Sequence, residues 1–282
     1  MPTFHARYPG GLAKAVTFSY DDGVEQDIRL VEIFDKYGMK GTFNINTGSF
    51  AEEGYVYPKG KIHRRMTKKQ TYELFANSRH EVAVHTLNHP FLEQLPMNIV
   101  LEEVLNDRKN IEEMFGTITR GMAYPFGTTS DTVVEALRMC GIVYSRTTKV
   151  TNSLELTKED WLKLPATCHH SSQNLNELSD KLINEKPTRT PWMLYVWGHS
   201  YEFESKDNWH IIENLCEKLS GKPDIWYATN IEIFDYLNAY NSLVFSNKGD
   251  MVYNPTAIEI FFMDSKIQKN YSIKPGETKK LN

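Results

Sequence analysis

Two neighbouring aspartates, Asp21 and Asp22, directly follow the strand-like apolar run AVTFSY at residues 15–20, and Gly23 comes next. A simple turn is one interpretation, because Asp and Gly both favour turns. The other interpretation is chemical: adjacent residues at a strand end project in different directions, so one carboxylate can bind a cation while the other acts as a base. The residues that the chain brings to the same place decide between the two.

The stretch VAVHTLNHP at residues 82–90 carries two histidines, His85 and His89. Their spacing predicts that both imidazoles lie on one side of a helical turn, where they can chelate one ion. Two imidazole nitrogens and one carboxylate oxygen leave coordination positions open for water and substrate, which is typical of a catalytic metal site. Thr86, between them, is either a residue that orients a ligand or an ordinary threonine at a strand end.

Strand-like and helix-like runs alternate along the chain, which favours an α/β fold with a parallel sheet. Seven or eight βα units fall within residues 1–241, the size of a (β/α) barrel, and no Gly-rich or Ser-rich linker divides them. Polar residues in such a barrel meet at the carboxyl ends of the strands. The candidates that follow strand-like runs are Asp21, Asp22, His85, Tyr124, Pro125, Arg146 and His199.

Helix signals support this division of the chain. Residues 25–38 have helical periodicity and end at Gly38, Thr67 with Gln70 forms a capping box, and a long helix is expected from about residue 96 to residue 115. Beyond residue 241 the pattern changes to short alternating runs with turn signals. We therefore predict a barrel domain at residues 1–241 and a small β-rich extension of three or four strands at residues 242–282.

Composition excludes several classes of protein. The formal net charge of the 282 residues is −4 with no long basic run, so nothing indicates nucleic-acid binding. No apolar segment reaches the roughly 18 residues of a membrane span, and the N-terminal residues lack a signal-peptide core, so we expect a cytoplasmic protein unless a leader was removed. Cys140, Cys168 and Cys216 are far apart and are expected to be reduced, buried thiols.

Four motifs, in their order along residues 12–240, resemble those of the polysaccharide deacetylase family, also called NodB-homology domains or carbohydrate esterase family 4. TFSYDDG resembles the TFDDG motif of the family, HTLNH its H(S/T)xxH motif, AYPFG its RxPYG-type motif, and LYVWGH its late histidine motif. The resemblance implies a distorted (β/α)7-type barrel and metal-dependent removal of acetyl groups from sugars.

The resemblance also implies a role for individual residues. Asp21 would be the base, Asp22, His85 and His89 would hold one divalent metal ion, and His199 would be the general acid. Zn²⁺ is the first choice for this ligand set, with Co²⁺, Ni²⁺, Mn²⁺ or Fe²⁺ as alternatives. The residues expected to contact a carbohydrate substrate are Tyr124, Pro125, Phe126, Arg146 and Trp197.

The chain departs from the family pattern at the third motif. Ala123 occupies the position of the arginine that pairs with the catalytic aspartate, and Arg120, three residues earlier, is the candidate to replace it. Phe126 stands where the family has tyrosine, although a backbone N–H that stabilises an oxyanion does not depend on the side chain. Tyr20 is an insertion that we interpret as harmless variation within the strand.

The fourth motif of the family, which contains a tryptophan, has only a loose counterpart in DWLKLPATCHH at residues 160–170. Trp161 is a candidate to stack on a sugar ring, although packing in the core is the favoured explanation. The roles of Asp160, His169 and His170 stay open.

The sequence therefore predicts a metal-dependent hydrolase that removes acetyl groups from an N-acetylated sugar or polysaccharide. An O-acetyl glycan esterase would use the same residues, and a non-catalytic carbohydrate-binding barrel is a second alternative. A phosphoesterase is disfavoured because such enzymes usually need a second ligand cluster, and none is evident. The sequence does not indicate an oligomeric state.

Overall fold

The computed structural model describes residues 3–156 and 160–281. Residues 1–2, 157–159 and 282, which include the outer ends of both predicted domains, lie outside the described residues. The three cysteines are buried free thiols, as predicted. Within the described ranges, no helix is both long enough and apolar enough to cross a membrane.

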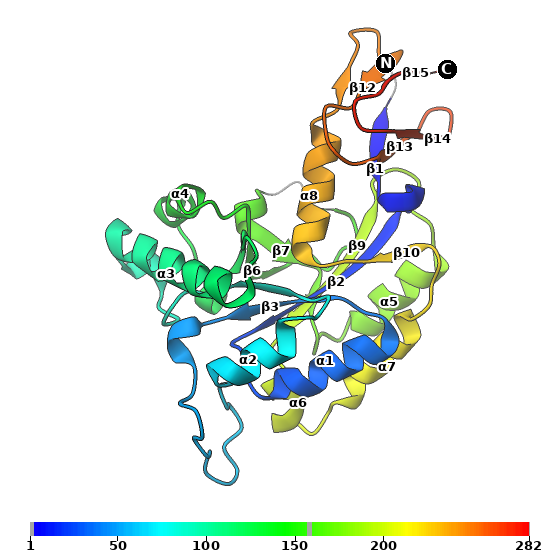
Figure 1. Cartoon of the computed structure of the whole chain (residues 1–282). Helices are drawn as coiled ribbons and strands as arrows, with labels where there is room; N and C mark the ends of the chain where they lie inside the picture. The colour runs from blue at the N-terminus through cyan, green and yellow to red at the C-terminus, as the bar shows by residue number, and fades with distance from the viewer. Residues whose placement is uncertain (1–2, 157–159, 282) are drawn as a thin grey trace.

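A parallel sheet forms the centre of the molecule, which confirms the predicted α/β class (Figure 1). Its main path runs β7-β6-β5-β4-β3-β2-β9-β8, and β10 pairs with the first half of β2 while β3 pairs with its second half. The strands are β2 (Lys14–Asp21), β3 (Gly41–Ile45), β4 (Glu81–Val84), β5 (Gly121–Ala123), β6 (Tyr144–Val150), β7 (Leu164–Ala166), β8 (Cys168–His169), β9 (Trp192–Gly198) and β10 (Ile225–Tyr227).

The two ends of the sheet meet in one short segment of chain. β7 pairs with β6, β8 pairs with β9, and only Thr167 separates β7 from β8. The backbone N–H of Thr167 donates to the carbonyl of Tyr195, 2.8 Å away in β9. The sheet therefore curls round on itself, as expected for a distorted (β/α)7-type barrel.

Helices cover the outside of the sheet (Figure 1), where α1, α5 and α7 lie side by side and α3 packs against α4. Gly38 ends α1 in the left-handed region at φ 76°, and capping boxes begin α2 and α8. The helices are α1 (Gln26–Tyr37), α2 (Lys68–Phe75), α3 (Met97–Phe115), α4 (Asp131–Met139), α5 (Leu175–Asn184), α6 (Tyr201–Ser205), α7 (His210–Leu219) and α8 (Asn230–Asn241).

The alternation of side chains along β2 explains why Tyr20 is tolerated. Phe18 and Tyr20 are buried among the helices, with Phe18 4.7 Å and Tyr20 6.0 Å from the ring centre of Phe34 in α1. Successive strand residues point to opposite faces, so Ser19 and Asp21 point into the barrel. The strand therefore supplies core packing on one face and the site on the other.

Short strands beyond α8 form two small antiparallel sheets at one end of the molecule (Figure 1). One has the order β11-β12-β15, and the other joins β13 and β14 to β1 from the N-terminal region. The strands are β1 (Phe4–Arg7), β11 (Val244–Phe245), β12 (Met251–Tyr253), β13 (Ile260–Asp264), β14 (Lys269–Ile273) and β15 (Thr278–Lys280). The extension is β-rich, with one strand more than the upper limit expected, and the domain boundary at residue 241 stays a prediction.

Candidate active site

The two aspartates at the end of β2 point in different directions because the backbone changes conformation between them. Asp21 is the last residue of β2, whereas Asp22 has φ 88°, in the left-handed region that only glycine adopts freely. Such a conformation costs roughly 1–3 kcal/mol and is concentrated at functional sites. Both carboxylates are buried, with 3% and 6% of the residue exposed.

Asp22 lies beside the two histidines of the HTLNH motif. Its Oδ1 is 3.9 Å from Nε2 of His85 and 3.7 Å from Nε2 of His89. One ligand atom from each of the three residues lies within 4.8 Å of the others, which allows a single ion to bind all three. We call Asp22, His85 and His89 the primary cluster.

The prediction that a helical turn brings the two histidines together is wrong. Residues 85–90 form an irregular loop in which Thr86 and His89 both have positive φ, at 65° and 58°. The hydroxyl of Thr86 accepts a hydrogen bond from the backbone N–H of His89, at 3.0 Å. Asn46 donates from its side chain to the carbonyls of His85 and Thr86. Side-chain hydrogen bonds therefore fix the loop, and the structure places Thr86 as a residue that orients the turn.

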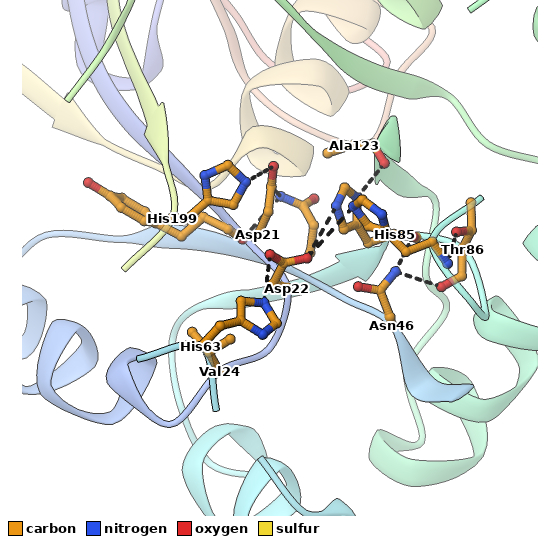
Figure 2. A network of polar contacts seen from close by, with 12 residues as sticks. Asp21, Asp22, Val24, Asn46, His63, His85, Thr86, Ala123 and His199 are labelled. Carbon is orange, nitrogen blue, oxygen red and sulfur yellow. Dashed lines mark hydrogen bonds and ion pairs between the residues drawn. The ribbon is translucent and has the colours of Figure 1, made fainter. Parts of the chain in front are cut away.

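The surroundings of His85 favour a metal-binding nitrogen. Its Nδ1 donates to the carbonyl of Ala123, 2.7 Å away, which leaves a lone pair on Nε2 directed at Asp22 (Figure 2). This Nε2 is buried and has no hydrogen-bond partner among the described residues. Burial lowers the pKa of His85 to about 4 and also lowers that of His89, so both rings are neutral near pH 7. The donor set and its protonation states fit a divalent transition metal.

Two residues that the sequence did not indicate also contact Asp22. His63 Nε2 lies 3.2 Å from Oδ2 of Asp22, and Arg65 Nη2 lies 3.1 Å from Oδ1. Figure 2 shows His63 and His85 approaching the carboxylate from different sides. Burial alone raises the pKa of Asp22, but the His63 hydrogen bond and the Arg65 charge hold it well below its usual range. Asp22 is therefore an anion ready to bind a cation.

Asp21 is held by a buried ion pair with Arg146. Arg146 Nη2 donates to Oδ2 of Asp21, and Asn44 donates to Oδ1 at 2.8 Å. The guanidinium lies 4.5 Å above the ring of Trp197. Burial raises the pKa of Asp21, but the charge of Arg146 outweighs it and holds the pKa below its usual value. The side chain is thus ionised at neutral pH and fixed in orientation.

Arg146 corrects two predictions at once. Arg146 was expected to contact substrate, but it is 0% exposed and therefore cannot do so. Ala123 in β5 occupies the position of the family arginine. Arg146 lies in register beside it on β6 and reaches Asp21 from this neighbouring strand. Arg120 does not reach Asp21, because its guanidinium pairs with Asp235 at 2.7 Å.

His199 lies on the other side of Asp21, after β9. Its Nε2 is 3.9 Å from Oδ2 of Asp21, and its Nδ1 donates to Oε1 of Glu202 at 2.9 Å. Burial lowers the pKa of His199, but the Glu202 hydrogen bond and the charges of Asp21 and Asp22 raise it above the usual value. The ring thus retains a proton to a higher pH than an exposed histidine does.

Two of the residues expected to contact substrate are part of the packed interior. Tyr124 is buried and donates from its hydroxyl to the carbonyl of Leu162 at 2.6 Å. Pro125 is buried beside it. Trp161 packs edge-on against Phe234 of α8, with ring centres 5.3 Å apart. The predictions for Tyr124 and Pro125 are wrong because both residues are buried, whereas Trp161 is half-buried and agrees with the packing alternative.

Phe126 is accessible. The residue is 46% exposed, and its ring stacks on Phe91 with ring centres 3.7 Å apart and lies 4.6 Å from the ring of His89. Trp197 is half-buried and supports Arg146 from below. Phe126 and Phe91 together form an exposed aromatic surface next to the primary cluster.

The polar partners that sequence reasoning missed differ in the signal they left. Asn44 and Asn46 alternate in the apolar strand sequence TFNIN, and polar residues on the inner face of a strand indicate a site. Glu202 lies three residues after His199, close enough to hydrogen-bond it. His63 and Arg65 belong to the irregular segment 50–66, which projects from the body in Figure 1, and no periodicity marks them.

Comparison with known proteins gives a family and a fold. Residues 10–145 match the family model described as polysaccharide deacetylase, which confirms the resemblance found in the motifs. No curated protein sequence matches the chain.

Solved structures have the same fold. A family 4 carbohydrate esterase from Streptomyces lividans in complex with acetate is 16% identical, with a TM-score of 0.51, over 77% of this chain and 93% of that one. A protein from Mycobacterium smegmatis assigned to the polysaccharide deacetylases is 17% identical, with a TM-score of 0.58, over 86% and 96%. The deacetylase PplD from Streptococcus pyogenes, in complex with acetate, is 26% identical with a TM-score of 0.41, and the match covers 47% of this chain and 55% of that one.

Proposed function

We propose that the protein is a metal-dependent hydrolase that removes acetyl groups from N-acetylated sugars or polysaccharides, because residues 10–145 match the polysaccharide deacetylase family model. The observation that carries the proposal is the position of Asp21 and His199. They face each other at 3.9 Å, beside the primary cluster of Asp22, His85 and His89. A base, an acid and a cation site thus converge on one point.

Asp22, His85 and His89 would hold a divalent cation, with Zn²⁺ as the first choice. Such an ion would supply Lewis-acid polarisation of the acetyl carbonyl and would lower the pKa of the attacking water.

Asp21 would accept the proton of the attacking water at Oδ2, next to Arg146. Its ionised state at neutral pH supports this role, because only the carboxylate can take a proton. Arg146 and Asn44 fix the direction of the carboxylate, and His199 would donate the proton on Nε2 to the departing amine. The backbone N–H of Phe126 is the proposed donor to the oxyanion.

The surroundings of the site support a carbohydrate substrate. Phe91 and Phe126 expose aromatic surface beside the site, of a kind that can pack against a sugar ring. A cavity of about 560 Å³ is lined mainly by polar residues, most of which follow Phe126 or Arg146 in the sequence. Its lining includes Thr128, Thr147, Thr148, Lys149 and Lys163. Hydroxyl and ammonium groups of this kind hydrogen-bond well to polyhydroxylated ligands.

The test is acetate release from N-acetylglucosamine oligomers and from acetylated xylan, with chelated and with zinc-reconstituted protein. We expect release from the oligomers that requires zinc and is lost in Asp21→Asn. Release from xylan alone would favour the esterase. No release from either substrate by protein that holds zinc in the primary cluster would reject the proposal.

A further inference from the structure

We propose that His169, His170 and Glu202 form a second transition-metal site, beside His199 and separate from the primary cluster. The two histidines lie at the end of β8 and in the turn after it, and Glu202 lies in α6. His169 Nε2 is 3.4 Å from Oε1 of Glu202, and His170 Nε2 is 3.7 Å from Oε2. One ligand atom from each residue lies within 4.8 Å of the others.

His170 provides the strongest indication of a ligand. The residue is 1% exposed, and neither of its ring nitrogens has a hydrogen-bond partner among the described residues. A buried polar group without a partner is destabilising, so buried imidazoles are normally hydrogen-bonded. A cation on Nε2 would give this nitrogen the partner that the protein does not supply.

Packing holds the His170 ring in place for this role. Tyr20 stacks nearly parallel to the ring at 5.9 Å, and Phe203 lies 4.2 Å from it. Gly198 packs closely against Nδ1 of His170, because a β-carbon placed on Gly198 would lie only 2.0 Å from this nitrogen. Nε2 is therefore the nitrogen available to a metal. Burial also lowers the pKa of His170 to about 3, so the ring is neutral and can coordinate.

His169 and Glu202 complete the set. The hydroxyl of Ser171 lies 2.7 Å from Nδ1 of His169, and the backbone N–H of Ser171 lies 3.2 Å from the same nitrogen. Metal binding at Nε2, which is directed at Glu202, takes the tautomer in which Nδ1 donates to the hydroxyl. The hydrogen bonds of Glu202 hold its pKa well below the usual range despite partial burial, so it is a carboxylate. Two imidazoles and one carboxylate are again a set that suits Zn²⁺, Co²⁺ or Ni²⁺.

The second site is coupled to His199 through one oxygen atom. Oε1 of Glu202 accepts the Nδ1 proton of His199, at 2.9 Å. A cation bound to Glu202 competes for this carboxylate and weakens its hold on His199. Occupancy of the second site is therefore expected to slow turnover, a consequence that rests on the proposed role of His199 as the acid. Lys206 Nζ lies 2.9 Å from Oε2 of Glu202 and opposes the cation by charge repulsion.

Bound zinc per chain tests the site without reference to activity. The metal-free protein is saturated with zinc, freed of excess by gel filtration and measured by mass spectrometry, with the visible spectrum of the cobalt form as a second readout. We expect two ions in the unaltered protein, one in His89→Gln, one in His169→Gln and none in the double variant. Lys206→Met should bind the second ion more tightly, and His210→Gln, which removes an exposed histidine outside the cluster, should still bind two.

Zinc content of His89→Gln separates the outcomes. One ion that is lost on adding His169→Gln establishes the second site, even if no acetate is ever released. No ion in His89→Gln, or one that survives in the double variant, overturns the proposal. In a protein that does release acetate, excess zinc should slow turnover of the unaltered chain and should do so less in His169→Gln.

Discussion

Nε2 of His199 and Oδ2 of Asp21 face each other across 3.9 Å, although 177 positions separate the two residues in the sequence. Each is held from behind by a group of opposite charge, Arg146 for Asp21 and Glu202 for His199. Arg146 favours the ionised form of Asp21, and Glu202 favours the protonated form of His199. The environments thus set the protonation states that a base and an acid need at the start of one reaction.

The ion pair of Asp21 and Arg146 should matter for folding as well as for chemistry. Arg146→Met leaves a buried carboxylate without its partner, and we expect a loss of roughly 3–5 kcal/mol in the free energy of unfolding. Urea denaturation measures this loss. Adding Asp21→Asn to the variant should restore part of the stability, because it removes the unpaired charge.

Arg120→Met is the matched control for Arg146→Met, since it breaks the partly exposed pair with Asp235. We expect it to cost at most about 1 kcal/mol. Equal losses in the two arginine variants would contradict the burial argument.

Glu202 should set the high-pH limit of activity. The acid must carry its proton, so the rate falls as pH rises through the pKa of His199. Glu202→Gln keeps a hydrogen-bond acceptor but removes the negative charge, so it lowers the pKa of His199. The decline of kcat/KM should therefore begin on the order of one pH unit lower.

The pH profile is measured with one equivalent of zinc, to limit filling of the proposed second site. Glu204→Gln, on the same helix but paired with Arg64, is the control and should leave the profile unchanged. A Glu202→Gln profile that coincides with that of the unaltered protein would show that Glu202 does not tune His199.

Much of the site follows from the sequence, because its main residues end strands of a parallel sheet. Asp21, Asp22, His85 and His199 each follow an apolar run, and strand ends meet at one edge whatever the details of packing. The alternation of strands and helices and most helix ends also follow from periodicity and caps, as at Gly38. Local signals were sufficient for these features.

The partner of Asp21 was not predictable from local signals. Whether Arg146 reaches Asp21 depends on its pairing with Ala123 across β5 and β6, a register that the sequence does not state. His63 and Arg65 were missed because segment 50–66 has no regular period, so nothing placed it near Asp22. The depth of Tyr124 likewise depends on packing between distant elements.

Asp27 should make stability depend on pH in an unusual direction. It is fully buried and accepts hydrogen bonds from Val24 N–H at 3.0 Å and from the Ser200 hydroxyl at 2.6 Å. Burial raises its pKa to about 7, whereas the unfolded chain ionises near the ordinary value of about 4. The contribution of the protonated carboxyl to stability is complete below about pH 4 and is lost as pH rises to about 7.

Asp27→Asn tests this dependence. The amide can accept from Val24 and donate to Ser200, and it does not titrate. The free energy of unfolding of the variant, minus that of the unaltered protein, should rise by about 1.4 kcal/mol per pH unit between about pH 4 and about pH 7. A difference that stays constant with pH would mean that Asp27 remains ionised in the folded protein.

Phe126 should bind substrate through its ring while straining its own backbone. The residue is 46% exposed beside His89, and its φ of 58° costs an L-residue about 1 kcal/mol that glycine does not incur. Phe126→Gly and Phe126→Ala both remove the ring, so both should raise KM for a glycan substrate about tenfold, or about 1.4 kcal/mol, with kcat unchanged.

Only the alanine variant retains the strain, so the glycine variant should be the more stable by about 1 kcal/mol in urea denaturation. A fall in kcat with KM unchanged would instead mean that the ring acts on the reacting groups, and equal stability of the two variants would mean that the loop relaxes when the ring is removed.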